Sequence, residues 1–428
     1  MIKDYDLPYG DNFIPVSIDN HLLHVDLIQP QKLTVINKDP ISLVREALSA
    51  PLGGESLINE IRPETQIAIV VNDKTRPVPN SELVMPLLQK LHEAGAQQTN
   101  IHFFVASGTH LPMAVDEIPL ILGKDIPKNY PVHVHDCDQD DNLCEIGSTT
   151  RGTPVYVNRQ FYDCDLKIVV GDIELHHFAG FSGGVKSAAI GLSGRSTINH
   201  NHKLLLDPNS TLGEYENNPL RQDIEEIGQL MGVHYALNAV IDENKQLVSV
   251  SFGDPKTVMR AGIQVVRRLS QIELKQPYDL VIASAGGYPK DINLYQSQKA
   301  MTHASFFCKP GGLIVLAAEC REGVGSKGYL DFMENIKNPA EIFIKFANQE
   351  FSVGPHKALQ IARILDRNPV YLHSLLTPEL IAHLFLSPIN LLSNDFTDFI
   401  RSHVPRDGRI AIIPYATACI PSFFGDHV

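Results

Sequence analysis

Four segments of the sequence combine glycine, histidine and charged residues in patterns that could carry chemistry. They are VVNDKTRPVP (70–79), SGTHLP (107–112), GDIELHHFAGFSGGVKS (171–187) and SAGGYPKDINLYQSQKAM (284–301). Each follows directly on an apolar run that predicts a strand, and in open α/β sheets ligands bind at the carboxyl ends of strands. One such segment would be an ordinary polar loop, whereas four in one chain indicate a functional site.

The third segment places a lysine behind a glycine-rich turn. Gly180, Gly183 and Gly184 allow turns with positive φ and a close approach of the backbone to a ligand. Lys186 would then lie in the first turn of a helix. Backbone N–H groups and the helix dipole favour an anion there, so the segment predicts a phosphate cradle. A solvated lysine after a strand–helix turn is the plain alternative.

Two general motifs fit this loop in part. It is nearly a P-loop, but Val185 occupies the position of the second required glycine. Residues 180–184 also match GxSxG, the nucleophile elbow of α/β-hydrolases, with Ser182 as the nucleophile. Each pattern alone is weak, so a phosphate site and a serine hydrolase both stay open at this point.

Histidines gather around the same loop. The chain has 18 histidines, and His176, His177, His200 and His202 lie close together in sequence. Neutral imidazole is the commonest transition-metal ligand and a suitable acid or base near neutral pH. On a helix, His200 and His202 would point apart, so one of the two is the expected ligand and the other incidental. An isolated loop histidine is usually a surface residue, but clustering beside the lysine loop favours function.

The first and fourth segments supply positive charge and polar groups. A guanidinium at Arg76, with its backbone stiffened by Pro77, could hold a carboxylate through two hydrogen bonds. Gln296 and Lys299 are three residues apart and share a helix face. Asp73 could equally be a turn residue or a helix cap. Taken singly, each of these side chains is more often a solvated surface group.

Strands and helices that alternate along the chain must position these segments, which predicts an α/β protein with mostly parallel sheets. Short apolar runs predict strands at 66–71, 101–106, 132–136, 166–170, 280–284 and 312–318, and amphipathic patterns predict helices at 81–95, 255–273 and 293–307.

A polar, proline-containing link at 271–279 predicts the domain boundary. We expect an N-terminal α/β cofactor-binding domain at 1–272 and a C-terminal α/β domain at 273–428 that closes the active site. The cleft between two such domains is the expected ligand site.

Composition narrows the class of function. The net charge is −13 without a long Lys/Arg run, which argues against a nucleic-acid partner. No apolar stretch reaches the roughly 18 residues needed to span a membrane, and the N-terminus does not resemble a signal peptide. The six cysteines include no CxxC pair and suit reduced thiols, so we expect a cytoplasmic protein.

Together, the motifs resemble one known family. The combination of DxTRPVP (73–79), SGTH (107–110), HxFAGFSGGxKS (176–187), NH (201–202) and GGYPxDxNxYQxxK (286–299) is similar to the catalytic subunit of nickel-pincer lactate racemases. The likeness runs through essentially the whole chain. It implies two α/β domains with the active site between them, and an isomerase that racemises or epimerises 2-hydroxy acids.

The resemblance also implies a cofactor, a nickel-pincer nucleotide (a pyridinium-3-thioamide-5-thiocarboxylic acid mononucleotide), made by separate maturation enzymes. Lys186 matches the lysine that carries it covalently, and His202 matches the protein ligand that completes the square-planar shell of Ni(II). Planar coordination is an expected geometry for that ion. The positions expected near the cofactor are Asp73, Thr75, Phe178, Gly180, Ser182, Gly183 and Gly184.

His110 and His176 match the two acid/base histidines of the family. The implied reaction is reversible, proton-coupled hydride transfer from a 2-hydroxy acid to the cofactor, which avoids a carbanion beside the carboxylate. One histidine takes the hydroxyl proton, and the second serves the opposite face after hydride returns. The residues expected to bind substrate are Arg76, Tyr295, Gln296 and Lys299.

Two departures from the family pattern bear on the substrate and cofactor. The lysine helix reads KSAAIG (186–191) where the family often has KSxxPG, and His356 or Lys357 falls where an aromatic is expected. A basic residue there suits a 2-hydroxy acid larger or more anionic than lactate. The alternatives are a serine hydrolase using Ser182 and a non-catalytic protein that binds a nucleotide cofactor.

Overall fold

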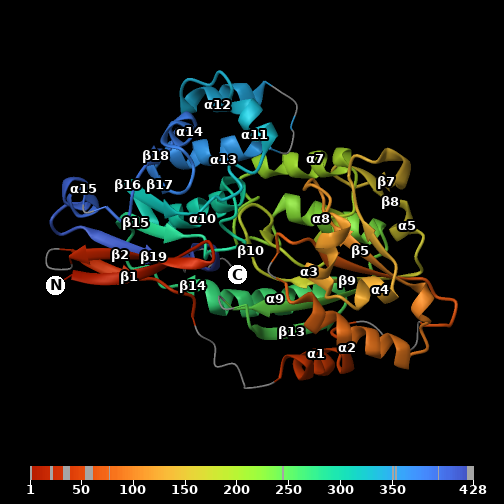
Figure 1. Ribbon diagram of the computed structural model, residues 1–428. Coiled ribbons are helices and arrows are strands. Elements are labelled where there is room, and N and C mark those ends of the chain that lie inside the picture. Colours follow the sequence, from red (N-terminus) through yellow and green to blue (C-terminus); the bar gives the residue numbers. More distant parts are fainter. Residues whose placement is uncertain are drawn as a thin grey trace. The chain divides into compact units, whose positions relative to one another are not determined.

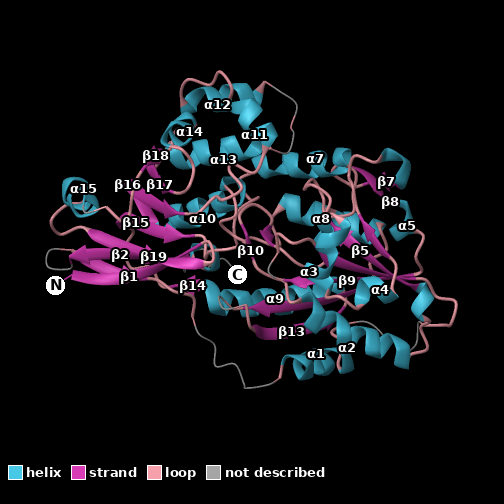
Figure 2. Cartoon of the chain, viewed as in Figure 1, coloured by secondary structure: helices cyan, strands magenta, loops and turns pink. Residues whose placement is uncertain are grey.

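The computed structural model describes residues 2–19, 23–31, 39–53, 61–76, 78–242, 245–348, 351, 354–393 and 395–421. Its helices and strands are drawn in Figures 1 and 2. The chain divides into two compact units, Leu33–Arg268 and Met1–Lys32 with Leu269–Val428. We call them the central unit and the terminal unit.

The central unit is built on a six-stranded sheet in the order β13-β12-β9-β4-β5-β6. The pairs from β12 to β6 are parallel, and β13 joins its edge antiparallel. The strands are β4 (Ile67–Asn72), β5 (Ile101–Ala106), β6 (Val132–Val134), β9 (Leu166–Asp172), β12 (Tyr235–Ile241) and β13 (Leu247–Gly253). Alternate residues such as Ile67, Ile69 and Val71 pack with Val44 and Leu83 of the first two helices in one core.

Helices and two short hairpins complete the central unit. The helices are α1 (Pro40–Ser49), α2 (Asn80–Glu93), α3 (Ile118–Leu122), α4 (Ile126–Asn129), α5 (Arg159–Tyr162), α6 (Lys186–Ala189), α7 (Arg195–Lys203), α8 (Pro219–Leu230) and α9 (Pro255–Ser270). The hairpins are β7 (Leu143–Ser148) with β8 (Pro154–Asn158), and β10 (Leu175–His176) with β11 (Gly180–Phe181).

The terminal unit has its own six-stranded sheet, in the order β18-β17-β16-β15-β19-β3, with parallel pairing throughout. The strands are β3 (His24–Leu27), β15 (Tyr278–Ser284), β16 (Cys308–Ala317), β17 (Val370–His373), β18 (Ser387–Pro388) and β19 (Arg409–Ile413). The helices are α10 (Leu294–Phe307), α11 (Lys327–Met333), α12 (Pro339–Ala347), α13 (His356–Leu365), α14 (Pro378–His383) and α15 (Asp395–His403). A short pair, β14 (Gln271–Ile272) and β20 (Ile420–Pro421), is also parallel.

The α/β class and the mostly parallel sheets are therefore confirmed, but residues 1–32 differ from the expected continuous domain 1–272. They belong to the terminal unit because β3 pairs with β19, and because the hairpin of β1 (Ile2–Tyr9) and β2 (Asn12–Asp19) packs on that unit's core. Pairing between the two ends of a chain leaves no local sequence signal. The expected cleft between the domains stays a prediction.

Two further expectations can be compared with the described residues. All six cysteines are free thiols. Among the described residues, no helix combines the length and apolarity that crossing a membrane requires.

Candidate active site

Asp73 and His110 follow β4 and β5, two neighbouring parallel strands, and meet at their carboxyl ends. His110 Nδ1 lies 2.7 Å from Asp73 Oδ2, while Thr75 donates its N–H and hydroxyl to Asp73 Oδ1 at 3.1 and 2.6 Å. Burial raises the pKa of Asp73, but the His110 charge and hydrogen bond, with those from Thr75, outweigh burial and hold it below its usual value. An ionised carboxylate only accepts, so Nδ1 carries the proton and Nε2 is the basic nitrogen of neutral His110.

Arg76 forms an ion pair that the sequence did not predict. Its Nη1 lies 2.7 Å from Glu174 Oε1, and both side chains are largely buried. Burial lowers the pKa of Arg76, but the negative charges of Glu174, Asp172 and Asp73 outweigh it and raise the pKa. A guanidinium paired with one carboxylate still carries further N–H donors for another. Pro77, expected to stiffen this turn, lies outside the described residues.

A cluster of aromatic rings joins the β10–β11 hairpin to α7. Phe178 lies edge-on to His176 and to His202, with ring centroids 4.5 and 5.2 Å apart. His177 stacks on His176 at 4.8 Å. His202 is buried, whereas His200 is exposed and its Nδ1 lies 2.9 Å from the Ser196 carbonyl oxygen. The helix therefore separates the two histidines, and His202 packs against Phe178, whose ring also contacts the predicted acid/base residue His176.

The tautomer of His176 is the opposite of that of His110. The backbone N–H of Ala179 donates to His176 Nδ1 at 3.2 Å. Nδ1 must then be the unprotonated nitrogen, so neutral His176 carries its proton on Nε2. The two histidines thus offer a basic Nε2 and a protonated Nε2, which are complementary for proton transfer.

The glycine loop does not present the row of N–H groups expected of a phosphate cradle. Three of these N–H groups are used within the protein. They belong to Ser182, Gly184 and Lys186, and they donate to the Glu174 carbonyl (2.8 Å), Asn238 Oδ1 (2.7 Å) and the Gly183 carbonyl (3.4 Å). The loop is fixed by these bonds and by the positive φ of Gly180, where a Cβ would lie 1.7 Å from the Glu214 carbonyl oxygen.

The hydroxyl of Ser182 is hydrogen-bonded to main-chain groups of the loop. Its buried hydroxyl lies 3.3 and 3.5 Å from the carbonyl oxygens of Asp172 and Glu174, and it accepts the Glu174 N–H at 3.2 Å. Within the described ranges, no imidazole forms a hydrogen bond with it. A serine nucleophile needs such a base, so this environment argues against the hydrolase alternative.

Lys186 begins α6 and lines a small cavity. The lining residues are Asn72, Arg76, Gly171, Asp172, Ser182, Gly183, Lys186, Ser187 and Asn238. Four of them, Arg76, Ser182, Gly183 and Lys186, are predicted site residues. The cavity therefore joins the first and third segments of the sequence, as their positions after the adjacent strands β4 and β9 require.

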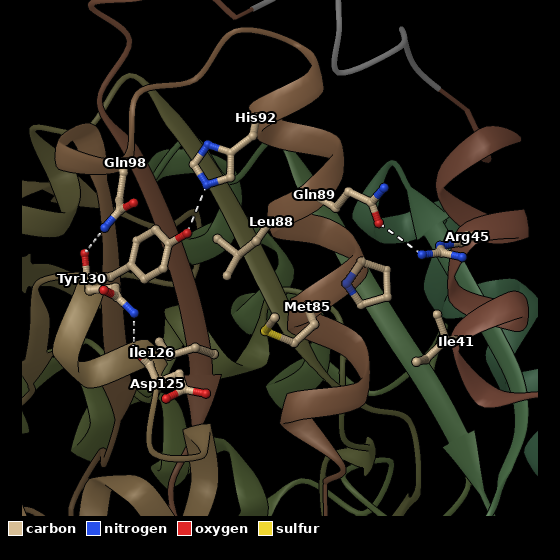
Figure 3. Close-up of a pocket in the computed structure, with 12 residues that line it drawn as sticks. Ile41, Arg45, Met85, Leu88, Gln89, His92, Gln98, Asp125, Ile126 and Tyr130 are labelled. Carbon is tan, nitrogen blue, oxygen red and sulfur yellow. Dashed lines mark hydrogen bonds between the residues drawn. The ribbon is translucent and has the colours of Figure 1, made fainter.

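A much larger pocket, of about 540 Å³, lies elsewhere on the central unit, among α1, α2 and α4. Figure 3 shows Met85, Leu88 and Ile126 around it, with the His92–Tyr130 and Arg45–Gln89 hydrogen bonds. None of the predicted site residues lines it. Its size therefore does not identify the site, because the predicted site residues Arg76, Ser182, Gly183 and Lys186 line the smaller cavity instead.

The predicted substrate residues of the fourth segment lie in the terminal unit, on the first turns of α10. Asn293 caps this helix by accepting the N–H of Gln296 at 3.0 Å, which fixes where the helix starts. Lys299 Nζ donates to Gln296 Oε1 at 2.7 Å, so these two residues share a face as expected. Burial raises the pKa of Tyr295, so the phenol stays protonated.

His356 and Lys357 open α13 and are both 1% exposed. Lys357 Nζ lies 4.5 Å from the centre of the Tyr295 ring and donates to Gln298 Oε1 at 3.0 Å. The His356 ring is edge-on to Tyr295, with centroids 6.0 Å apart, and its Nδ1 accepts the N–H of Gly354. Both residues therefore contact Tyr295, and Lys357 brings a charge to it.

Comparison with known proteins decides the family. Residues 9–213 match the lactate racemase N-terminal domain, and residues 274–420 match the lactate racemase C-terminal domain. The chain belongs to the lactate racemase family. Lactate racemases are isomerases, so the chain belongs to a family of isomerases.

Two named family members are similar to the chain over nearly their whole length. It is 30% identical to the lactate racemase of Thermoanaerobacterium thermosaccharolyticum over 98% of this chain and 99% of that one. It is also 30% identical to the lactate racemase of Lactiplantibacillus plantarum, over 96% and 97% of the two chains.

Solved structures agree with this assignment. The lactate racemase apoprotein from T. thermosaccharolyticum superposes with a TM-score of 0.88 at 28% identity, covering 98% of this chain and 100% of that one. A Thermotoga maritima protein shares the fold, with a TM-score of 0.67 at 16% identity over 90% and 99% of the chains.

The sequence alone did not indicate several residues that contact the candidate site. Glu174 pairs with Arg76, Asn238 holds the N–H of Gly184, and Arg221 donates to the carbonyls of Phe181 and Gly183 at 3.1 Å. Glu174 lies inside the third segment and its acidity was a usable signal. Arg221 and Asn238 are far from the motif in sequence, and nothing local marks them as buried partners of the loop.

Proposed function

We propose that this chain racemises or epimerises 2-hydroxy acids with a nickel-pincer nucleotide carried on Lys186 and ligated by His202. The observation that carries the proposal is that a member of this family carries two motif histidines of opposite tautomer: His110 has a basic Nε2 and donates to Asp73, and His176 has a protonated Nε2. A racemase needs both a proton acceptor and a proton donor, because each enantiomer is in turn substrate and product.

The residues present fit the proposed cofactor. Lys186 supplies an amine that lines a polar cavity, and His202 supplies a buried imidazole, a ligand that suits Ni(II). Phe178 lies edge-on to both His176 and His202, and all three side chains are buried. When held by Lys186 and His202, the group would supply a reversible hydride acceptor for the substrate carbon. Asp73, Thr75 and the glycine loop form the protein surroundings in this proposal.

The chain's own residues handle the proton and the carboxylate. His110 Nε2 accepts the proton of the substrate hydroxyl, and Asp73 holds the ring so that this nitrogen stays available. His176 donates from Nε2 for the opposite direction. Arg76 binds the substrate carboxylate through the donors that Glu174 does not use.

The proposed substrate is a 2-hydroxy acid with a second anionic or strongly polar group. Tyr295, Gln296 and Lys299 bind the substrate in this proposal, and Lys357 adds a second ammonium that lies over Tyr295. Lactate has only a methyl group beyond its reacting carbon, which gives such an ammonium nothing to pair with. A malate-like or sugar-acid substrate would pair with it.

Mass spectrometry of the intact protein, produced together with the cofactor-making enzymes, tests the proposal. We expect an adduct that is lost in Lys186→Ala and retained in Lys203→Ala, which removes an exposed lysine of α7. An adduct-free wild type would refute the cofactor, and labelling of Ser182 by an organophosphonate would favour the hydrolase instead.

Chiral chromatography of enantiopure malate, 2-hydroxyglutarate, aldonates and lactate tests the substrate class. We expect turnover of an anionic or polyhydroxy acid above that of lactate. A protein that carries the adduct but turns over none of these acids would support the non-catalytic alternative.

A further inference from the structure

The helix α8, which no motif of the sequence includes, carries three buried charged residues. Arg221 and Asp223 are fully buried, and Glu225 is 6% exposed. Taking charges out of water costs several kcal/mol per ion unless partners replace the water. The hydrogen-bond partners of these residues therefore show which segments α8 keeps in place.

Arg221 holds the loop that precedes Lys186. Its Nη1 donates to the Phe181 carbonyl and its Nη2 to the Gly183 carbonyl, both at 3.1 Å. Its charge is balanced by Glu225, whose Oε1 lies 2.9 and 2.6 Å from Nε and Nη2. A planar guanidinium reaches two carbonyls and a carboxylate at once, which a lysine ammonium cannot do in one plane.

Two more contacts tie α8 to the same loop. Gly228 faces Val185, the residue before Lys186, so closely that a Cβ on Gly228 would lie 2.4 Å from the Val185 Cβ. Asn218, the cap of α8, donates to the Phe178 carbonyl at 2.8 Å. The helix therefore contacts the segment at three points on the way to the lysine.

Asp223, on the same helix, holds the other half of the site. Its Oδ2 accepts from Asn201 Nδ2 at 2.9 Å, and Asn201 also donates to the Leu220 carbonyl at 3.0 Å. Asn201 directly precedes His202 in α7. The hydroxyls of Thr149 and Thr153 donate to the two oxygens of Asp223 at 2.6 and 3.0 Å, so a neutral polar network surrounds the carboxylate.

We infer that α8 is an internal frame that fixes Lys186 relative to His202. In it, Arg221 is a positioning residue for the lysine loop and Asp223 is a positioning residue for the helix that carries His202. Two attachment points for one rigid group must keep a set separation, since displacements near 1 Å suffice to spoil such sites. The inference rests on the proposed function for its purpose, but the frame itself can be tested in the unmodified protein.

Amide hydrogen exchange of the cofactor-free protein is the first test. Arg221→Lys keeps a positive charge but loses the fork, so we expect exchange at Ser182, Gly184 and Lys186 to accelerate about tenfold, with α7 unchanged. Asp223→Asn should do the reverse, accelerating exchange within Arg195–Lys203 and leaving the loop unchanged. A merely destabilising substitution would not produce this crossed pattern.

Matched controls make the same substitutions outside the frame. Arg260→Lys alters an exposed ion pair with Glu216, and Asp398→Asn alters an exposed pair with Arg401. Neither should change exchange in the loop or in α7. Equal acceleration of both segments in both frame variants, or no acceleration in either, would overturn the inference.

If Arg221→Lys fails to fold, Gly228→Ala is a second variant that tests the contact between α8 and the loop before Lys186. The added Cβ must push Val185 away, so exchange at 185–189 should accelerate while α7 stays protected. Unchanged protection there would count against the frame as firmly as an unresponsive Arg221 variant.

The loaded protein gives the second readout. Arg221→Lys should lower the fraction of chains that carry an adduct on Lys186, whereas Asp223→Asn should keep the adduct and weaken nickel binding about 10- to 100-fold. Intact mass and nickel content measure the two effects separately. A wild type without adduct would refute the proposed function, while the exchange data would still judge the frame. If both variants carried as much adduct and nickel as the wild type, the frame would be refuted and the proposed function would stand.

Discussion

Two buried cations, one in each unit of the chain, contact residues with different proposed roles. Arg221 in the central unit is bound by the Glu225 carboxylate and by main-chain carbonyls of the lysine loop. Lys357 in the terminal unit donates to the neutral amide of Gln298 and lies over the Tyr295 ring. Arg221 is therefore tied to the loop before Lys186, whereas Lys357 brings its charge to Tyr295, a residue proposed to bind the substrate.

In the proposed function, the two units have different roles: residues of the central unit carry the reaction, and Lys357 of the terminal unit affects which substrate is preferred. The central unit contains the proposed acid/base pair, the proposed cofactor lysine and the proposed metal ligand, all within motifs typical of the family. The terminal unit contains the departure from the family pattern that bears on the substrate, at His356 and Lys357. Substitutions in the first region should therefore affect all substrates alike, and substitutions at Lys357 should change which substrate is preferred.

The largest effect is expected at His110. His110→Gln removes the proton acceptor but keeps a polar side chain, so kcat should fall about 10²- to 10⁴-fold on every 2-hydroxy acid that the wild type uses. Chiral chromatography measures the rates, and intact mass should show the Lys186 adduct unchanged. A fall in kcat on only one substrate would contradict the proposal that residues of the central unit act on all substrates alike.

A smaller, selective effect is expected at Lys357. Lys357→Met keeps the length of the side chain and removes its charge, so kcat/KM should fall about 10- to 100-fold on the anionic substrate and little on lactate. Lys345→Met is a matched control, because Lys345 Nζ lies 4.7 Å from the Phe332 ring and donates to a carbonyl in the same unit. An equal loss on both substrates would show that Lys357 is structural.

The sequence predicted those parts of the molecule that are local along the chain. The central strands, the helices at α2, α9 and α10, and the glycine loop followed from apolar periodicity and turn residues. The tethering of the loop by Arg221 and Asn238 could not be predicted, because an Arg–Glu pair four residues apart usually marks an exposed helix face. The membership of β3 in the terminal sheet depends on pairing between distant segments, for which no local pattern exists.

The same limit explains why the phosphate cradle was expected at the lysine loop. Glycines followed by Lys-Ser indicate free N–H groups only if nothing else in the fold accepts them. Asn238, on β12, and the Glu174 carbonyl occupy N–H groups of this loop. A glycine-rich sequence specifies the shape of a loop, and the partners brought by distant segments decide what it can bind.

The smallest predicted effect concerns stability in the Asp73–His110 pair. Because the pKa of Asp73 lies below its usual value of 3.8, the ionised carboxylate adds stability that is fully present above that value and is lost as pH falls through the folded pKa. His110, Thr75 and Arg76 are the neighbours that stabilise this charge. Asp73→Asn should therefore lower the free energy of unfolding by about 1–3 kcal/mol near pH 7. The deficit should shrink below about pH 4.

Urea unfolding followed by circular dichroism at pH 7 and at steps down to pH 3 measures this difference between wild type and Asp73→Asn. Asp398→Asn removes a carboxylate from an exposed pair in the terminal unit, and its small effect should show no comparable change in this range. A deficit for Asp73→Asn that is the same at every pH would mean that the ionised form is not what the site favours. The assignment of the basic nitrogen to His110 Nε2 would then fail, because that assignment requires an accepting carboxylate at Nδ1.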